Sequence, residues 1–442
     1  MTECKPQKLV LSRLGRRSVE CDFTGGRLTS DAGLVLLREV DRRLGLLDAI
    51  NQAIPDPRDP RYILHEQRGL LAQRILAIAA GYEDENDHQA LRSDPALQVA
   101  AGRIPEEDQP LGSPSTLCRL ENRIHRKTIW RLHGVLVEQF LASYATPPEE
   151  ITLDLDATDD PTHGEQEGRF FHGYYRHYCY LPLYVFCGEH LLCGYLRPSN
   201  IDVAKHSRAI SKLLVEKIRQ RWPKVRITLR GDSGFCRWRL MRWCEKHGVN
   251  YIFGLARNSR LEQQSGELQQ QAETQFEASG EKQRLFGEFS YAAGSWDRER
   301  RVIAKAERLP KGANPRYIVT NLPGEAQRLY DEVYCARGEM ENRIKEQQLC
   351  LFADRTSCHT LLANQFRLLL SGFAYTLLKA LRRLGLEGTK LAKAQASTLR
   401  LKLVKVAARV RVTARRVVFH LASSYPLQDL FATLCQRMLQ PG

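Results

Sequence analysis

The stretch Ile151-Thr-Leu-Asp-Leu-Asp, residues 151–156, decides the fold of this 442-residue chain. Apolar and polar residues alternate along it, so its three apolar side chains share one face of a β-strand, and Asp154 and Asp156 share the other. Aspartate is disfavoured inside strands. A charged carboxylate among apolar neighbours is costly unless a cation neutralises it. We therefore expect a core strand that carries a functional carboxylate at its end.

The residues that follow this strand switch between the periodicities of strands and helices. In order, the patterns predict strands at 174–187 and 191–196, a helix at 204–221, a strand at 225–229, a helix at 238–247 and a strand at 251–255. Three strands, a helix, a strand, a helix and a strand is the element order of a ribonuclease-H-like α/β fold. We expect that fold for the core.

The chain is strongly basic, with 66 Lys and Arg against 51 Asp and Glu and a formal net charge of +15. Twelve Lys or Arg and one acid, Glu387, lie between Leu378 and His420. Such an excess attracts polyanions, of which nucleic acid is the commonest for a soluble protein. From Ser397 to Ser424, β-branched and basic residues alternate. This alternation predicts a pair of strands with one basic face.

The two ends of the chain and the region after the core pattern predict further domains. Helical patterns at 31–47, 65–80 and 115–145 dominate the first part, which we interpret as a DNA-binding module. After a polar, Gln- and Glu-rich stretch at 262–281, strand-like and helical patterns alternate again. They predict strands at 285–291, 301–307 and 317–320, and helices at 325–351 and 360–384.

These patterns divide the expected α/β chain into five parts. They are an N-terminal helical domain that binds DNA (1–148), the first part of a catalytic core (149–257), a β-rich insertion (258–322), the second part of the core (323–385) and a basic C-terminal region (386–442).

Candidate catalytic residues follow from the chemistry of cutting nucleic acid. In-line attack on a phosphodiester is served by two divalent cations about 3.5–4 Å apart, and Mg²⁺ prefers oxygen ligands. Acidic residues on separate elements must therefore converge. Asp156 ends an apolar strand, with Asp154 as the alternative two residues earlier. Asp232 follows the next predicted core strand, between Gly231 and Gly234, which permit close approach of a ligand; its alternative role is a helix cap.

A third carboxylate lies in the predicted helix at 325–351. On a regular helix, residues three or four apart share one face, and one such stripe mixes an aromatic residue, two cations and a carboxylate. The stripe is made of Tyr334, Arg337, Glu341, Lys345 and Gln348. A core face does not have this composition, so the stripe is either a ligand-binding face or a solvated face with ordinary ion pairs.

These motifs resemble those of the DDE transposases of bacterial insertion sequences. The stripe is similar to their Y-(2)-R-(3)-E signature, and the Asp156-Ala-Thr and Arg230-Gly-Asp-Ser-Gly-Phe stretches resemble their two Asp motifs. The family pattern continues with Lys seven positions after the Glu, where this chain has Gln348, with Lys345 one turn earlier. More narrowly, the chain resembles the insertion sequence 1380 family through further stretches. These are 31–33 (DAG), 81–87 (GYEDEND), 91–95 (LRSDP), 354–358 (DRTSC) and 363–367 (ANQFR).

The resemblance implies a transposase that binds the ends of an insertion sequence, cleaves them with two Mg²⁺ ions (Mn²⁺ as a substitute) and joins them to target DNA. Asp156, Asp232 and Glu341 would hold the metal, and no other cofactor is implied. The DNA-binding residues would be Tyr334, Arg337 and Lys345 near the nick, and Trp296 in the insertion for an extruded base; packing of Trp296 within the insertion is the alternative. Double-stranded DNA is the expected partner, bound by a dimer.

Two other functions fit part of this pattern: a ribonuclease-H-like nuclease of the resolvase type, and a catalytically inactive DNA-binding protein. The sequence has no apolar run of the ~20 residues that a membrane helix needs, and we expect no membrane partner. Its N-terminus lacks the apolar stretch of a secretory signal. Twelve cysteines without a CxxC pair indicate reduced thiols. We expect a cytoplasmic, nucleoid-associated bacterial protein.

Overall fold

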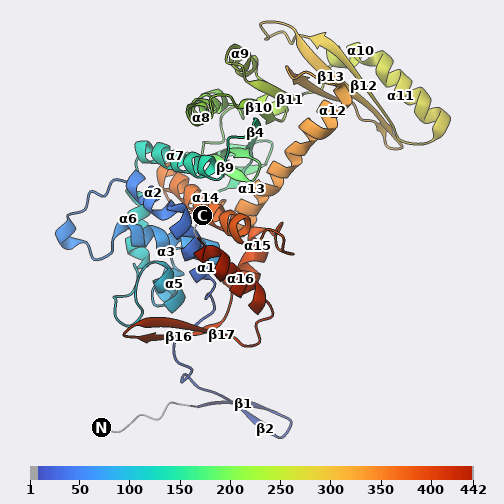
Figure 1. The fold of residues 1–442 in the computed structure, drawn as a ribbon. Coiled ribbons are helices and arrows are strands. Elements are labelled where there is room, and N and C mark those ends of the chain that lie inside the picture. The colour runs from blue at the N-terminus through green and yellow to red at the C-terminus, as the bar shows by residue number, and fades with distance from the viewer. Residues whose placement is uncertain (1–7, 441–442) are drawn as a thin grey trace, which may run out of the picture. The chain divides into compact units, whose positions relative to one another are not determined.

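The computed structural model describes residues 8–440 (Figure 1). The chain forms two compact units. One comprises Met1–Leu120 together with Leu377–Gly442, and the other comprises Glu121–Thr376. The candidate site residues all belong to the second unit.

A mixed sheet, of nine strands within the described chain, forms the centre of the second unit. β4 (Glu150–Ala157) pairs in parallel with β10 (Arg226–Gly231) and antiparallel with β8 (Leu183–Cys187). β9 (His190–Tyr195) flanks β8, and β11 (Asn250–Leu255) lies parallel to β10. Beyond β11 the sheet continues with antiparallel strands. These are β15 (Arg316–Thr320), β13 (Arg300–Leu309) and β12 (Gln283–Tyr291), with the short β14 (Gly312–Ala313) paired to β13.

The strand predicted at 151–156 is confirmed as the middle of this sheet. Ile151, Leu153 and Leu155 are buried, and their alternation places them on one face of β4. Helices α8 (Ser207–Arg221) and α9 (Trp238–Lys246) connect the parallel strands, because parallel neighbours need a crossover rather than a hairpin. Their apolar faces and that of α7 (Arg126–Ala142) close one hydrophobic core with the strands.

The prediction of a single strand at 174–187 is wrong, because two strands form there and Leu181-Pro182 separates them. β7 (His177–Tyr180) ends there and β8 begins afterwards. Proline has no N–H for a strand ladder, so it favours such a break. β7 pairs instead with β5 (Asp160–Pro161) and β6 (Phe170–His172) in a separate small sheet.

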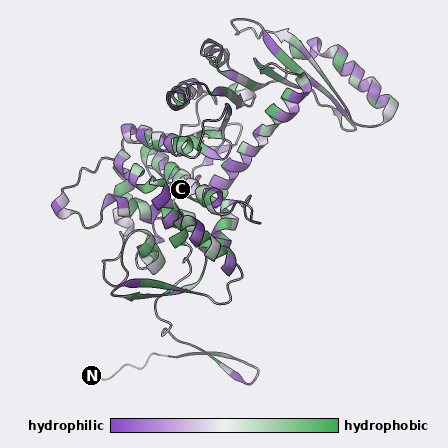
Figure 2. Cartoon of the chain, in the orientation of Figure 1, coloured by the Kyte–Doolittle hydropathy of each residue, from purple (hydrophilic) through white to green (hydrophobic). Residues whose placement is uncertain are grey.

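The strands expected between 285 and 320 occur as β12, β13 and β15, and they extend the central sheet through the β15–β11 pair. The polar stretch before them is helical. α10 (Ser259–Gln264) is capped by Asn258, whose side chain accepts from the Leu261 N–H at 3.1 Å, and α11 (Gly266–Ser279) packs on β12 and β13. Hydrophilic residues are frequent along α11 (Figure 2), and its Gln and Glu residues are good helix formers.

The helix expected at 325–351 is present but irregular. It consists of α12 (Ala326–Arg328), a π-helical turn at Leu329–Tyr334, a 3₁₀ turn at Cys335–Arg337 and α13 (Gly338–Leu351). π and 3₁₀ turns change the rotation per residue, so side chains on either side leave the simple helical register. The spacing of Tyr334 and Arg337 therefore does not follow a regular helical stripe.

The first unit joins the two ends of the chain. Its N-terminal part contains the hairpin β1 (Leu9–Leu14) and β2 (Arg17–Cys21), then β3 (Leu28–Thr29), α1 (Leu34–Leu44), α2 (Leu46–Ala53), α3 (Gln67–Ala80), α4 (His88–Leu91), α5 (Pro95–Ala100) and the start of α6 (Pro114–Asn122). Its C-terminal part contains the end of α14 (Leu361–Gly385), α15 (Ala396–Leu399), β16 (Ala408–Thr413), β17 (Arg416–Leu421) and α16 (Gln428–Leu439). No helix within residues 8–440 has the length and apolar character needed to cross a membrane.

Three elements predicted toward the ends of the chain differ from those in the structure. The helix expected at 31–47 is interrupted at Gly45, which has φ 60°, and the helix expected at 115–145 is broken between α6 and α7. The alternation at 397–424 gives the strand pair β16–β17, but residues 397–404 are helical. Leu399, Leu403 and Val404 are buried there, and tertiary packing overrides the local strand pattern.

We expect Gly33→Ala to destabilise the first unit. A Cβ at Gly33 would lie 1.8 Å from the Leu403 carbonyl oxygen, and the Gly33 N–H donates to the Val404 carbonyl at 3.1 Å. The required backbone shift costs about 1–3 kcal/mol. Gly69→Ala is the matched control, because a Cβ at this position in α3 meets nothing within 4 Å; it should stabilise by about 0.5–1 kcal/mol. Thermal unfolding measures both, and equal shifts for the two variants would contradict this account.

Candidate active site

Asp156 lies near the carboxyl end of β4, at the edge of the sheet where β10 also ends. Its side chain is 15% exposed. One oxygen accepts a hydrogen bond from the Ala157 N–H at 2.9 Å, and the other lies 3.6 Å from a guanidinium nitrogen of Arg337. The carboxylate is therefore nearly enclosed, with one cation beside it.

Asp154, the alternative to Asp156, is held in a different arrangement. It is 4% exposed and forms a bidentate ion pair with Arg230 of β10, at 2.5 Å from Nε and 2.8 Å from Nη2. The third Arg230 nitrogen donates to the Val333 carbonyl in the π-helical turn. Burial raises the pKa of Asp154, and Arg230 opposes that rise. Because both oxygens of Asp154 are engaged by a buried guanidinium, this pair anchors the irregular helical segment to the sheet.

Asp232 comes directly after β10 and caps the 3₁₀ turn Ser233–Phe235, accepting from the Gly234 N–H at 2.9 Å. Both glycines beside it permit tight packing. A Cβ at Gly231 would lie 3.2 Å from Phe235, and one at Gly234 would lie 2.7 Å from Val203. The two roles that the sequence offers for Asp232, a helix cap and a catalytic carboxylate, are compatible, because the cap engages only Oδ1.

Tyr334 reaches from the π-helical turn to the strand ends. A Cβ at Gly254 of β11 would lie 2.6 Å from the Tyr334 hydroxyl and 2.9 Å from the Ser233 N–H. Only glycine leaves this space, so β11 admits the tyrosine beside Asp232. Burial raises the pKa of Tyr334; the charge of Arg337 opposes the rise and that of Asp232 adds to it.

Arg337 joins the strand carboxylate to the helix carboxylate. One of its nitrogens lies 2.7 Å from Glu341 Oε1, one helical turn later, and the other faces Asp156. The Glu341 side chain is 44% exposed, so it is more open than that of Asp156. Burial lowers the pKa of Arg337, but the charges of Asp156 and Glu341 outweigh it and the pKa is raised.

The three predicted carboxylates act on one another electrostatically. The pKa of Asp156 is raised to about 7, mainly by burial; the charge of Arg337 opposes the rise, and those of Asp232 and Glu341 add to it. β4, β10 and α13 therefore bring the three groups into one site. Burial is the main reason that Asp156 holds its proton more tightly, and the two neighbouring carboxylates add to the effect.

Lys345 and Gln348, later on α13, have different surroundings. Lys345 is exposed and has no carboxylate within 4.0 Å in the described chain. Gln348 is half-buried and donates to the Asp159 carbonyl at 3.0 Å, which ties α13 to the loop after β4. Gln348, which stands where the family pattern has a lysine, therefore makes a structural contact. The exposed cation Lys345 lies one turn earlier on the helix.

Trp296 is not brought to this edge of the sheet. Leu255 pairs with Tyr317, and Lys305 with Arg316, near the carboxylates. Tyr291 and Arg300 pair at the other end of the sheet, and the 292–299 turn follows there. Trp296 packs edge-on against Tyr291 at 5.6 Å and under Arg300. Its contact with an extruded base stays a prediction, and the structure shows it packed within the turn.

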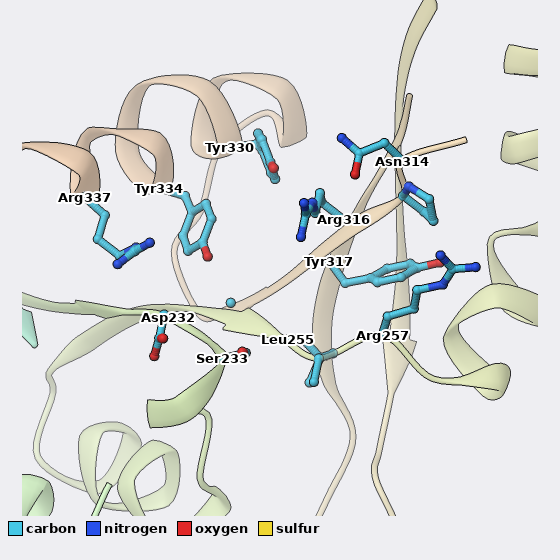
Figure 3. Close-up of a pocket in the computed structure, with 13 residues that line it drawn as sticks. Asp232, Ser233, Leu255, Arg257, Asn314, Arg316, Tyr317, Tyr330, Tyr334 and Arg337 are labelled. Carbon is cyan, nitrogen blue, oxygen red and sulfur yellow. The ribbon is translucent and has the colours of Figure 1, made fainter. Parts of the chain in front are cut away.

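A cavity of about 430 Å³ opens beside Asp232. Figure 3 shows Tyr334 and Arg337 projecting from the helical segment toward the strand end that carries Asp232 and Ser233. Tyrosines and arginines dominate the wall: Tyr317, Tyr330, Tyr334, Arg257, Arg316 and Arg337. Such a wall suits an anionic ligand with planar groups.

Sequence reasoning missed Gly254 and the cavity residues Arg316 and Tyr330. A glycine within the apolar strand Tyr-Ile-Phe-Gly-Leu was a usable signal, because an isolated strand glycine often marks close backbone approach. Arg316 and Tyr330 gave no such signal. Their place at the site depends on the pairing of β15 with β11 and on the π-helical turn.

The residues suit a divalent cation by their chemistry. Within residues 8–440, no three His, Cys, Asp or Glu side chains lie close enough together to hold a metal ion as they stand. Arg337 contacts the same Asp156 and Glu341 oxygens that a metal would need. The donors are carboxylate oxygens, which Mg²⁺ prefers. A metal held by Asp156 and Glu341 would compete with Arg337 for these oxygens.

Residues 11–441 match the family model described as transposase DDE domain group 1. Among solved structures, the chain is similar to piggyBac transposase in its synaptic complex with hairpin DNA, with 11% sequence identity over 94% of this chain and 83% of that chain. The TM-score is 0.42, which is too low to establish a common fold. No curated protein matches the sequence significantly.

Asp156→Asn should change how stability depends on pH. The folded pKa of about 7 lies above the ordinary value of about 3.9, so the folded state binds the extra proton between these values. Stability of the metal-free chain therefore falls as pH rises from about 4 to about 7 and is level above. Removing the charge should stabilise the chain by about 2–4 kcal/mol at pH 8 and by little below pH 4.

Urea unfolding with a chelator present measures this difference. Glu339→Gln is the matched control, since Glu339 is an exposed carboxylate on α13 whose replacement should leave the pH profile unchanged. An Asp156→Asn chain that is no more stable than the parent at pH 8 would show that the carboxylate is not destabilised by burial.

Proposed function

Since the chain belongs to the transposase DDE domain family (group 1), we propose that it cleaves the ends of an insertion sequence and joins them to target DNA. Asp156, Asp232 and Glu341 are its catalytic carboxylates. The single observation that carries this assignment is their convergence. They come from β4, from the end of β10 and from α13, and Asp232 and Glu341 both raise the pKa of Asp156.

The strand order supports a ribonuclease-H-like core. The order β9–β8–β4–β10–β11 places three antiparallel strands beside two parallel ones, with α8 and α9 as the crossovers. In such a sheet the ends of β4 and β10 lie side by side, which is where the two aspartates stand. The strands from 283 to 320 are added after β11, between the second and third carboxylates.

Asp156 rather than Asp154 is assigned to catalysis because of their different partners. Both Asp154 oxygens bind the buried Arg230, and a carboxylate locked in that pair is poorly placed to exchange ligands. Removing one member of a buried pair typically costs about 3–5 kcal/mol. Asp154 therefore acts as a positioning residue for the π-helical turn, and Asp156 remains open to a cation.

Asp156, Asp232 and Glu341 would hold two Mg²⁺ ions, with Mn²⁺ as a substitute. Such ions activate the attacking oxygen and stabilise the leaving one during in-line displacement. Asp156, with a pKa of about 7 in the metal-free chain, must lose its proton before it can bind. Arg337 neutralises part of the site in the meantime, and the arriving phosphate offers its guanidinium a new anionic partner.

Tyr334, Arg337 and Lys345 are assigned to the DNA near the cleaved bond. Arginine suits bidentate contact with a phosphate. Lys345 is exposed on the same helix without a competing carboxylate. The cavity beside Asp232 adds Arg316 as a further cation on this edge. Membership in the insertion sequence 1380 family, the five-part domain division, a dimer on DNA and a nucleoid-associated cytoplasmic location stay proposals.

Conversion of a single carboxylate should abolish cleavage. Asp232→Asn and Glu341→Gln each remove a metal ligand, and we expect Mg²⁺-dependent nicking of duplexes that carry the element's own ends to fall at least about 10³-fold. The cleaved strands are mapped on a denaturing gel, and strand transfer of the freed 3′ end distinguishes a transposase from a resolvase-type nuclease.

Glu339→Gln again serves as the control, because it makes the same chemical change two residues before Glu341 on the same helix and should retain cleavage. Metal-dependent nicking that survives both Asp232→Asn and Glu341→Gln would refute the assignment. A parent chain that binds the ends but never nicks them would indicate an inactive DNA-binding protein.

A further inference from the structure

The hairpin β16–β17 carries a row of cations outside the candidate active site, in the other unit of the chain (Figure 1). Its two strands are joined by a two-residue turn at Ala414-Arg415. We call these strands with their turn, residues 408–421, the basic ribbon. Its basic residues are Arg409, Arg411, Arg415, Arg416 and His420, and it contains no acid.

The register of the basic ribbon gathers most of these cations on one face. Arg409 faces His420 across the ladder, Arg411 faces Val418 and Thr413 faces Arg416. Because side chains alternate across a strand, these six residues share a face. Arg409, Arg411 and Arg416 are exposed. Residues two apart on a strand are separated by about 6.8 Å. In one strand of duplex DNA there is one phosphate for about every 3.4 Å along the helix axis. Arg409 and Arg411 therefore span the rise of two phosphates.

The opposite face fixes the ribbon to the fold. Ala408 and Val410 are 4% and 5% exposed, and Val412, Val417 and Phe419 are half-buried. β16 also pairs with β3 through Ala408↔Thr29 and Arg409↔Leu28. The cations therefore stand on a supported strand pair rather than on a loose tail.

None of the four ribbon arginines has a carboxylate within 4.0 Å among residues 8–440, and none donates a side-chain hydrogen bond there. Three exposed cations elsewhere on the chain are paired instead: Arg42 with Glu39, Lys212 with Glu216, and Arg226 with Glu150. No acid occurs between Glu387 and Asp429. Unpaired cations on one exposed face repel one another, and an external polyanion removes that repulsion.

We propose that the basic ribbon is a duplex-DNA-binding surface of this chain that acts through phosphate contacts by Arg409, Arg411 and Arg416. This inference rests on the proposed function, since it takes DNA as the polyanion. A two-stranded β-ribbon has a width that the major groove of B-DNA admits. The ribbon lies in a different compact unit from the carboxylates.

The test compares the salt dependence of binding to a short fluorescent duplex of random sequence, by anisotropy between about 50 and 200 mM salt. The triple variant Arg409→Gln, Arg411→Gln, Arg416→Gln should lower the steepness of log K against log salt by about 2.7, since each lost phosphate contact removes about 0.9. Affinity at about 0.1 M salt should fall on the order of 10²-fold.

Three controls separate this result from other causes. The triple Arg42→Gln, Lys212→Gln, Arg226→Gln removes the same charge from paired sites and should keep the slope of the parent. The Arg409→Lys, Arg411→Lys, Arg416→Lys triple should also keep it, and circular dichroism checks that every variant is folded. Asp232→Asn should bind with the parent slope while it loses cleavage.

Binding by the Gln triple with an unchanged slope overturns the proposal, even if the chain cleaves element ends. An equal loss in the paired-site triple overturns it too, because the effect then belongs to net charge. A loss confined to single-stranded DNA refutes the duplex assignment. If the Gln triple loses duplex binding and the parent never cleaves ends, the ribbon stands and the proposed chemistry fails.

Discussion

The burial of a carboxylate at the end of β4 is the constraint on which the site depends. Asp156 is almost enclosed, and two further carboxylates face it from β10 and α13. Charge of one sign cannot accumulate in such a place without a counter-ion. Arg337 supplies one positive charge beside it, and the pKa of Asp156 is still raised to about 7, mainly by burial. In the proposed function, a divalent cation would take the place of that proton.

The rest of the core holds this charge cluster together. Arg230 binds Asp154 on β4 and the Val333 carbonyl on the π-helical turn, so one buried guanidinium joins sheet and helix. Gly254 leaves room for the Tyr334 hydroxyl above β11. The π and 3₁₀ turns then set the direction in which Arg337 and Glu341 leave the helix. In the proposed function, changes at these positions would act on catalysis by moving the site residues, without contacting the substrate.

Local patterns in the sequence predicted the elements of the core well, because alternation and helical periodicity depend on which face is buried. Such patterns predicted the strands β4, β10 and β11 and the two helices that connect them. In β4, for example, the pattern is the alternation that buries Ile151 and Leu153. Non-local packing decided the rest. The helix at 397–404 forms because Leu403 and Val404 are buried, and the ion pair of Arg230 with Asp154 depends on the pairing of β4 with β10. Asp156, Asp232, Glu341 and Arg337 were all named from the sequence, but the contact of Arg337 with Asp156 was not.

The binding of Mn²⁺ to the DNA-free chain, followed by electron paramagnetic resonance from about pH 5.5 to about pH 8.5, tests the central claim most directly. If Asp156 must lose its raised proton to accept a cation, affinity rises as pH passes through about 7 and levels above it. Asp156→Asn then abolishes both the binding and its pH dependence, whereas Glu339→Gln changes neither. Affinity that is independent of pH, or that survives Asp156→Asn, would contradict the account.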